Sequence, residues 1–468
     1  MRKLLAAGIG IMVVTVLVRF AIATTDPEWR QVVLEAASRA LFAMMPGSAP
    51  SESRGSPVQG SVVDARTHWP IGGAQILVGA ERATTDPNGH FTLHHVPATY
   101  DVTIADSNAA SVSVYRGLHR RNPLLAHQPH VPLEMPAHGG VVRGMLAGGG
   151  PYPIARGWVD IHFFSAEAEG RGLVTNVFVL NMPGVPEVHG PEYGPIILHW
   201  NGPDWVSGEL VALRGTPEVA AAAPTMAFWF GRRKLTLTTA ETVSADLHLE
   251  PVPVGRITGE VVKADGYHGV TQIDLDYILP GAGGTLPVVS DTSPPPNGFD
   301  YPVPDLRSQG ARLCVTAFSG YGEWLWHRRC GFAPGAKVSL RLQSPPALTP
   351  PSNSDGVGPG MGISWTGAPG DIYELTLAAG DPKPDNPHIH IYTSDPAATW
   401  PDLAELGVPL PEAGTSYDGR LARLGPYRTL DQATGPEGLG ARAPREQWLS
   451  LEREVRLTVR PSSSDLRR

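Results

Sequence analysis

The chain has 468 residues and contains 53 Gly and 47 Pro, and this amount of Gly and Pro excludes a mainly helical protein. Hydrophobic residues make up 42% of the chain, which excludes a disordered protein. The formal net charge is −8 and no long basic run is present, which argues against a nucleic-acid partner.

Residues 1–23 are typical of an export signal. Arg2 and Lys3 precede the apolar run Leu4–Val18, and an Ala-x-Ala site ends at Ala23. The segment is either cleaved after Ala23 or retained as a membrane anchor, because roughly 20 apolar residues are near the minimum that spans a bilayer. No Cys follows the apolar run, which excludes a lipoprotein anchor.

Residues 24–56 are predicted to form a short helix and a linker. Apolar residues recur at helical spacing over 26–45, with Asp26 as the N-cap and Pro46 after the last turn. The stretch Ser48–Ser56 is rich in Ser, Pro and Gly, which is typical of a flexible linker.

Residues 57–135 are predicted to form a small β-sandwich. Short strands alternate with turns about every ten residues, as in sandwich folds. Asp86–Gly89 reads Asp-Pro-Asn-Gly, in which Pro fixes φ and the Asn-Gly pair supplies positive φ, so a tight turn is expected there.

This stretch contains, in order, the patterns V-x-G-x-V-x-D-A, P-I-x-G-A-x-I-x-V and T-D-x-N-G-x-F-x-L. Their order and spacing resemble the carboxypeptidase regulatory-like domain, a small transthyretin-like β-sandwich of exported bacterial proteins. The residues that carry the resemblance are structural. Gly60 permits close strand packing and Asp86–Gly89 make a turn, so the resemblance implies no catalytic residue.

The opening pattern recurs more weakly at Val141–Met145 and at Ile257–Val262. We therefore expect a divergent β-sandwich with long loops over 139–251 and a further β-sandwich over 254–344. Each module is expected to close its own core.

The last module, 361–461, contains Trp365 in a predicted early strand, and its stretch Leu410–Tyr417 reads L-P-x-x-G-T-x-Y. These features resemble a fibronectin type III-like sandwich, in which Trp365 takes the place of the core Trp of an early strand and Tyr417 that of a core anchor. The family's usual continuation after that Tyr is missing here. The whole chain is thus predicted to be all-β, with tandem small β-sandwich modules on an N-terminal export signal or anchor helix and a linker.

The two cysteines, Cys314 and Cys330, lie in one predicted hairpin of the third module. A turn between two alternating strands would place them side by side, and in an oxidising compartment a disulfide is expected. The alternatives are two buried free thiols or a metal pair, although two Cys alone do not fill a zinc site.

Two histidine patterns invite a metal interpretation. His189 and Glu192 have the His-x-x-Glu spacing of zinc carboxypeptidases, but they lie in a Pro-rich loop of a chain that does not alternate strands with helices. His388 and His390 share one strand face, but two ligands are too few, and we interpret them as exposed strand residues. No metal site and no cofactor are expected.

A nucleophile motif and a phosphate-binding loop are both absent from the sequence. Trp324 and Trp326 are the candidate ligand-binding residues, since alternation puts both on one strand face, where aromatics stack on sugars or pack on a partner. The alternative is that this face belongs to the core. Only five of the 37 basic residues are Lys, which we interpret as coding bias and not as a recognition signal.

The sequence therefore predicts an exported, non-enzymatic multi-module protein of the bacterial cell envelope that acts as a spacer and an adhesion or interaction scaffold. One alternative is a carbohydrate-binding protein that uses an exposed sandwich face. A second is a metal-dependent hydrolase that uses the loop insert of the second module. The expected partner is an envelope protein or a glycan, and also the membrane if the N-terminal segment is retained.

Overall fold

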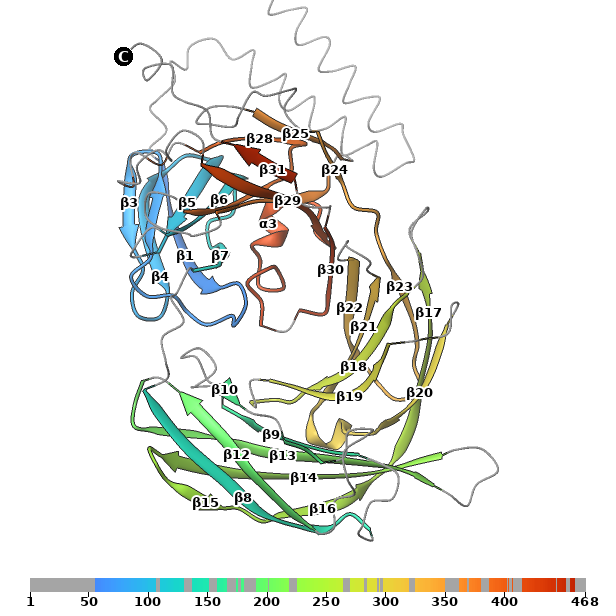
Figure 1. Cartoon of the computed structure of the whole chain (residues 1–468). Coiled ribbons are helices and arrows are strands. Elements are labelled where there is room, and N and C mark those ends of the chain that lie inside the picture. Colours follow the sequence, from blue (N-terminus) through green and yellow to red (C-terminus); the bar gives the residue numbers. More distant parts are fainter. Residues whose placement is uncertain are drawn as a thin grey trace, which may run out of the picture. The chain divides into compact units, whose positions relative to one another are not determined.

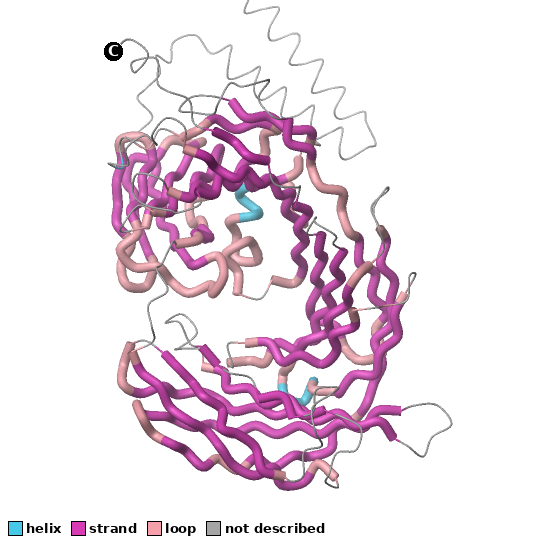
Figure 2. The backbone as a smooth tube through the Cα atoms, viewed as in Figure 1, coloured by secondary structure: helices cyan, strands magenta, loops and turns pink. Residues whose placement is uncertain are grey.

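The computed structural model describes one compact unit of the chain, Ser56–Arg468, in part. The described residues are 55–458 except for 107–109, 130–136, 151–157, 166–173, 176–177, 181–190, 201, 219–224, 264–269, 282–283, 293, 295–297, 320–324, 350–361, 368–369, 380–386, 402, 404–405, 407–414, 443 and 452–454. Strands occupy most of this part of the chain, which confirms the all-β prediction (Figure 2).

The predicted export signal over 1–23 and the predicted helix over 26–45 lie outside the described residues. Within the described ranges, no helix is long and apolar enough to cross a membrane. The stretches 57–135, 139–251, 254–344 and 361–461 are called the first to fourth modules below.

The first module contains a three-stranded sheet and four further strands. The three-stranded sheet has the order β4 (His90–Val96), β1 (Ser56–Asp64) and β7 (Leu124–His127). The other strands have the order β3 (Glu81–Thr84), β2 (Gln75–Val78), β5 (Tyr100–Ala105) and β6 (Ser111–Leu118). Apolar side chains from both sets of strands pack into one core, as expected for a sandwich.

The local features predicted for the first module are present. Gly60 lies under the Phe91 ring, where a Cβ atom would come within 2.5 Å of the ring carbons. Gly89 has a φ of +74° and donates its N–H to the Asp86 carbonyl at 2.8 Å. The Asp86 carboxylate also accepts the backbone N–H groups of Asn88 and His90, so the turn is closed on both sides.

The second module forms a nine-stranded sheet of its own. Eight strands follow the order β10 (Val174–Thr175), β12 (Glu192–Trp200), β8 (His138–Gly148), β16 (Leu247–Val252), β14 (Thr225–Thr238), β13 (Trp205–Glu218), β9 (Trp158–Phe164) and β11 (Phe178–Leu180). The ninth strand, β15 (Thr242–Ser244), pairs with β8. Its core contains the fully buried Trp200.

The third module combines a three-stranded sheet with four further strands. The sheet order is β20 (Phe299–Pro304), β17 (Val254–Val262) and β23 (Lys337–Arg341). The other strands have the order β19 (Thr285–Asp291), β18 (Gln272–Ile278), β21 (Arg312–Ser319) and β22 (Leu325–Phe332). A short 3-10 helix, η2 (Arg307–Gln309), precedes β21.

The fourth module follows the same plan. Its strands β25 (Gly362–Thr366) and β28 (Ala397–Thr399) form a three-stranded sheet with β24 (Ala347–Thr349), which lies before residue 361, in the order β24, β25 and β28. The remaining elements are β26 (Ile372–Ala379), β27 (His388–Thr393), β29 (Ser416–Gly425), α3 (Leu430–Ala433), β30 (Glu446–Leu451) and β31 (Val455–Thr458). Trp365 packs edge-on against Tyr373, and Tyr417 packs against Trp400, so both predicted core aromatics are buried.

The larger sheets of the first, third and fourth modules are joined edge to edge into one sheet of thirteen strands (Figure 1). Strand β6 pairs in parallel with β27, from Ser111 opposite His388 to Tyr115 opposite Tyr392. Strand β30 pairs with β29 on one side and with β22 on the other. Main-chain hydrogen bonds therefore cross both module boundaries.

The cores also cross module boundaries, so the prediction that each module closes its own core is wrong. Tyr392 and Leu424 of the fourth module belong to the core of the first. Val114 of the first module belongs to the core of the fourth. Phe228 and Phe230 of the second module pack into the core of the third. The edge strands carry apolar side chains that a single sandwich cannot cover alone, and the neighbouring module buries them.

Candidate binding site on the third module

A disulfide joins Cys314 of β21 to Cys330 of β22, which confirms the predicted bridge. The two residues are direct cross-strand partners, and their Cα atoms are 4.0 Å apart. Opposed residues of an antiparallel pair direct their side chains to the same face of the sheet. The bridge therefore marks one face of the sheet, and the side chains two residues away on each strand share that face.

Strand alternation separates the two faces of this part of the sheet. Ile273, Leu275 and Tyr277 of β18 are buried in the module core. Their neighbours Gln272 and Asp274 lie on the disulfide face and are half-buried. This face is therefore polar, while the opposite face closes the sandwich.

Two cross-strand rows define the disulfide face. The first row contains Gln272, Phe318, Trp326 and Leu449. The second row contains Asp274, Thr316, Arg328 and Gln447. The face thus places two aromatic rings beside a band of carboxylate, hydroxyl, amide and guanidinium groups.

A groove of about 450 Å³ runs over these rows and over part of β19. Trp326 and Phe318 supply aromatic walls, and Asp274 and Ser290 supply polar groups. The Gln272 amide holds Asp274 at 2.8 Å and also reaches the Ser290 hydroxyl, so these groups are fixed before any ligand arrives. An apolar ring face and oriented hydrogen-bonding groups are the two features that a sugar-binding surface needs.

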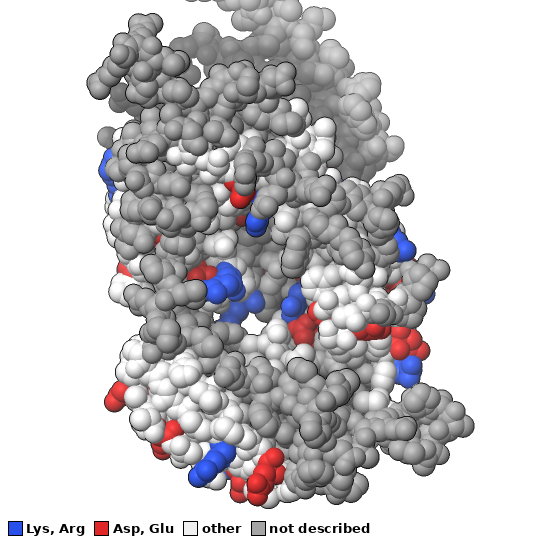
Figure 3. All heavy atoms as spheres, in the orientation of Figure 1, with Lys and Arg blue, Asp and Glu red and all other residues white. Residues whose placement is uncertain are grey.

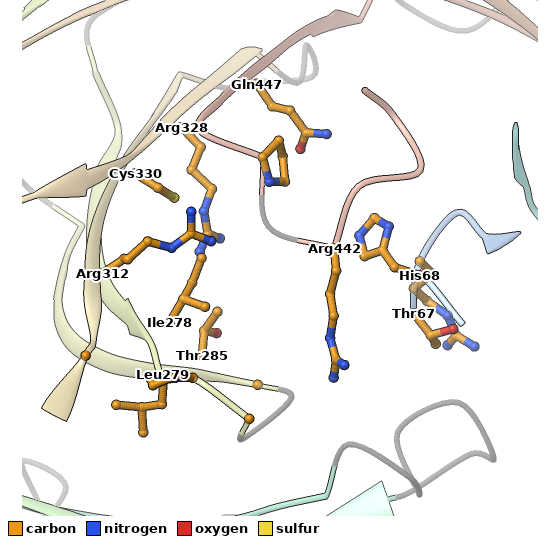
Figure 4. A pocket seen from close by; sticks show the side chains of 16 residues that line it. Thr67, His68, Ile278, Leu279, Thr285, Arg312, Arg328, Cys330, Arg442 and Gln447 are labelled. Carbon is orange, nitrogen blue, oxygen red and sulfur yellow. The ribbon is translucent and has the colours of Figure 1, made fainter. Parts of the chain in front are cut away.

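A second cavity, of about 650 Å³, adjoins the groove and shares Thr285, Arg328 and Gln447 with it. Figure 4 shows Arg312 and Arg328 on one side of this cavity and Arg442 and His68 on the other. We call this cavity the arginine pocket. In the view of Figure 3, basic side chains gather beside a hollow near the centre of the described surface.

Two arginines of the arginine pocket are held by contacts with neighbouring side chains. Arg328 donates to the Asp276 carboxylate, which is 8% exposed. Burial raises the pKa of Asp276 to about 6, although the charge of Arg328 acts to lower it. Arg442 stacks over the Trp69 ring at 5.7 Å, which orients its guanidinium.

His68 lines the same pocket in an uncommon conformation. Its φ is +59°, in the left-handed region that residues with a Cβ atom rarely adopt. Its buried Nδ1 atom has no hydrogen-bond partner among the described residues. Burial lowers the pKa of His68, Asp64 opposes that shift, and Arg442 adds to it. The ring is therefore neutral at pH 7 and has one unused polar atom.

The structure describes one of the two tryptophans that the sequence suggests as ligand-binding residues. Trp326 is half-buried and lines the groove, so it lies on the outer face and not in the core. Trp324 lies outside the described residues.

The predicted histidine sites do not gather into a metal centre in the part of the chain that is described. His189 lies outside it, and Glu192 is an exposed residue at the start of β12. The prediction of exposed strand histidines is wrong for His390, which is 4% exposed and bonds Glu374 at 3.0 Å. His388 is half-buried. The His390 ring lies beside the Glu374 and Thr376 side chains of the neighbouring strand β26. No group of three or more potential metal ligands occurs among the described residues.

The sequence did not indicate the arginine pocket. Its basic residues come from positions 66 to 442, so no local run of charge exists. The low Lys content gives no information on where the arginines lie in the fold. The one available signal was alternation, which puts Arg328 on the same face as Trp326.

No family model matches the chain, and no curated protein matches it in sequence. The resemblances to the carboxypeptidase regulatory-like domain and to the fibronectin type III-like fold therefore stay predictions.

Solved structures match the chain only weakly. A leucine-rich repeat protein from Bacteroides thetaiotaomicron is 10% identical with a TM-score of 0.15, and the match covers 44% of this chain and 27% of that protein. A streptococcal ancillary pilin is 9% identical with a TM-score of 0.15, over 62% of this chain and 98% of the pilin. A minor pilin of Streptococcus agalactiae is 8% identical with a TM-score of 0.16, over 47% of this chain and all of the pilin. These TM-scores are too low to indicate a shared overall fold, so the matches carry no argument about function.

Proposed function

We propose that the chain is an exported, non-enzymatic scaffold of the bacterial cell envelope, whose β-sandwich modules act as spacers and hold interaction surfaces. The observation that carries this proposal is the thirteen-stranded sheet, which continues through three modules. Modules on flexible linkers move independently, whereas modules that share main-chain hydrogen bonds and a core keep a fixed arrangement. A fixed arrangement is what a spacer requires.

The boundary between the first and fourth modules supports this proposal in detail. The His388 N–H donates to the Ala110 carbonyl at 2.9 Å, which continues the strand pairing. The Tyr115 and Tyr392 rings stack with centroids 4.4 Å apart, and both residues are buried. The disulfide supports export, because such bridges persist in oxidising compartments.

The test is to express the full chain, and a variant that lacks residues 1–23, in a bacterial host. The full chain is expected in the envelope fraction with both cysteines resistant to alkylation, and the truncated variant in the cytoplasm. The purified full chain is expected to show no turnover in hydrolase panels. Recovery of the full chain in the cytoplasm, or a chelator-sensitive hydrolytic activity lost in His189→Ala, would contradict the proposal.

Carbohydrate binding is a second candidate function, and the groove favours it. Trp326 and Phe318 flank fixed polar groups on an outer sheet face. On a glycan array, Trp326→Ala should lose binding that the unaltered chain shows. The matched control is Trp205→Ala, because Trp205 is 43% exposed on the second module, away from the groove. Equal loss in both variants would contradict a groove-specific role.

A further inference from the structure

The arginine pocket differs in charge from the groove that it adjoins. Arg66, Arg312, Arg328 and Arg442 line the pocket, and no Asp or Glu is among its described lining residues. Asp274 and Asp276 line the groove instead. One continuous surface is therefore cationic at one end and carries carboxylates at the other.

The cationic end is suited to an anion of small size. A guanidinium presents parallel N–H donors that match the two oxygens of a carboxylate. Arg312 and Arg328 project from the neighbouring strands β21 and β22 on the disulfide face, and Arg442 approaches from the opposite wall (Figure 4). His68 adds a buried ring nitrogen without a described hydrogen-bond partner in the same wall.

The carboxylate end is unsuited to an anion. Asp276 is paired with Arg328, whereas Asp274 would repel a phosphate or carboxylate placed over the groove and can accept hydrogen bonds from neutral hydroxyl groups. A uniformly charged polyanion such as nucleic acid therefore fits the pocket and not the groove. Phe318 and Arg312 are six residues apart on β21, which corresponds to about 20 Å at the usual rise per residue. A ligand that contacts both ends must span several sugar units.

We propose that this surface binds a polysaccharide that contains both neutral and acidic sugars. The neutral sugars stack on Trp326 and hydrogen-bond the groove, and a uronate carboxylate enters the arginine pocket. The inference rests on the carbohydrate-binding function proposed above. It adds the charge of the ligand and the residues that bind the charged group.

The experiment measures binding of a hyaluronan octasaccharide, which alternates uronate and N-acetylhexosamine, to the full-length oxidised chain by calorimetry. The matched ligand is the same octasaccharide with its carboxylates converted to methyl esters, and inorganic phosphate serves as the free anion. We expect the acid form to bind at least about tenfold more tightly than the ester, since charge-assisted hydrogen bonds are lost in the ester. We also expect this preference to weaken as salt is raised.

Arg312→Gln and Arg442→Gln should each weaken binding of the acid form about tenfold and leave binding of the ester unchanged. Trp326→Ala should weaken both forms. The matched control is Arg329→Gln, which removes a charge from β22, the strand paired with that of Arg312, where Arg329 donates to the Ser339 carbonyl of β23 instead of lining the pocket. Each variant is first checked for an intact disulfide and an unchanged melting temperature.

The outcomes separate this inference from the function on which it rests. Equal, Trp326-dependent binding of acid and ester would overturn the charge assignment but keep the carbohydrate-binding function. Binding of phosphate without binding of either octasaccharide would overturn both. Loss of acid binding in Arg329→Gln as large as in Arg312→Gln would also overturn the inference, because the effect would then come from net charge and not from the pocket.

Discussion

The second module and the other three modules are attached in different ways. The first, third and fourth share one hydrogen-bonded sheet, in which β6 pairs with β27 and β22 pairs with β30. The second module keeps its nine strands to itself among the described residues and contacts the third through side chains such as Phe228 and Phe230. One attachment is made by a shared sheet and a shared core, and the other by core packing alone.

This difference predicts two kinds of cooperativity. Breaking a shared sheet exposes backbone groups and apolar side chains together, so the modules on either side should unfold as one. Breaking a packed contact exposes only side chains, so the second module should be able to unfold separately. The predictions below run from the largest expected effect to the smallest.

Replacing Tyr392 by Ala should have the largest effect. Tyr392 is buried between the first and fourth modules and stacks on Tyr115, so we expect a loss of about 3–5 kcal/mol of unfolding free energy. Hydrogen exchange should show β5 and β29 losing protection together. The matched change is Trp200→Ala, whose loss of protection should stay within the second module. If Tyr392→Ala leaves β5 protected, the first and fourth modules do not fold as one unit.

Replacing both Cys314 and Cys330 by Ala should cost roughly 3 kcal/mol in the chain-entropy model, because the bridge closes a loop of 16 residues in sequence separation. Urea unfolding of the oxidised chain and the variant measures the difference. Because β22 pairs with β30, the destabilisation should reach the fourth module and spare the second. An equal loss of protection in the second module would contradict the distinction between the two attachments.

Acid should destabilise the first module more than the second. Burial, with a smaller contribution from His390, lowers the pKa of His127 to about 3, so the native ring stays neutral while the unfolded ring gains a proton below its usual pKa of 6.5. The free energy of unfolding therefore decreases as the pH falls below 6.5, by about 2 kcal/mol at pH 5. In His127→Gln, the urea midpoint of unfolding should change less between pH 7 and pH 5 than in the unaltered chain.

In the second module, two titratable groups change the free energy of unfolding in opposite directions as the pH falls. Burial lowers the pKa of His162 to about 4 and raises that of Asp160 to about 6. The native Asp160 carboxyl gains a proton before the unfolded one does, which adds stability as the pH falls from 6 towards 3.8 and offsets the loss from His162. An equal acid response in both modules would contradict this account.

Replacing Gly89 by Val should have the smallest of the four predicted effects. We expect a loss of more than about 1 kcal/mol of unfolding free energy. A β-branched residue is strained at a φ of +74°, and its Cβ would come within 2.5 Å of the Val62 carbonyl oxygen. Because the first module shares a core with the fourth, both should show the loss in hydrogen exchange. A loss confined to the hairpin would mean that the shared core does not couple them.

Local features of the fold could be predicted from the sequence, and contacts between modules could not. The turn at Asp86–Gly89 and the bridge between Cys314 and Cys330 depend on residues close in the chain, so spacing and turn chemistry are sufficient to find them. The pairing of β6 with β27 depends on two edges whose sequences also suit a solvent-exposed strand. His390 shows the consequence, because its polar side chain indicated exposure and the side chain is buried in the structure.

The residues of the candidate site also differ in whether the sequence could predict them. Trp326 was identified by alternation within one hairpin, and the structure places it in the groove. Arg312 and Arg442 come from separate stretches of the chain, and the sequence gives no reason to associate them. Only the three-dimensional arrangement brings them to one cavity.

The contact between β6 and the fourth module also sets an order of events during folding. The Arg116 guanidinium donates to the Thr399 carbonyl at 2.7 Å, and these residues are 283 positions apart in the chain. Contacts of such long sequence separation slow folding, because a large loop must close before they form. During synthesis the first module emerges with its β6 edge unpaired, and it stays so until most of the chain has followed. In that interval the open edge can pair with another chain, so fast release from a chaperone would favour aggregation over the native fold.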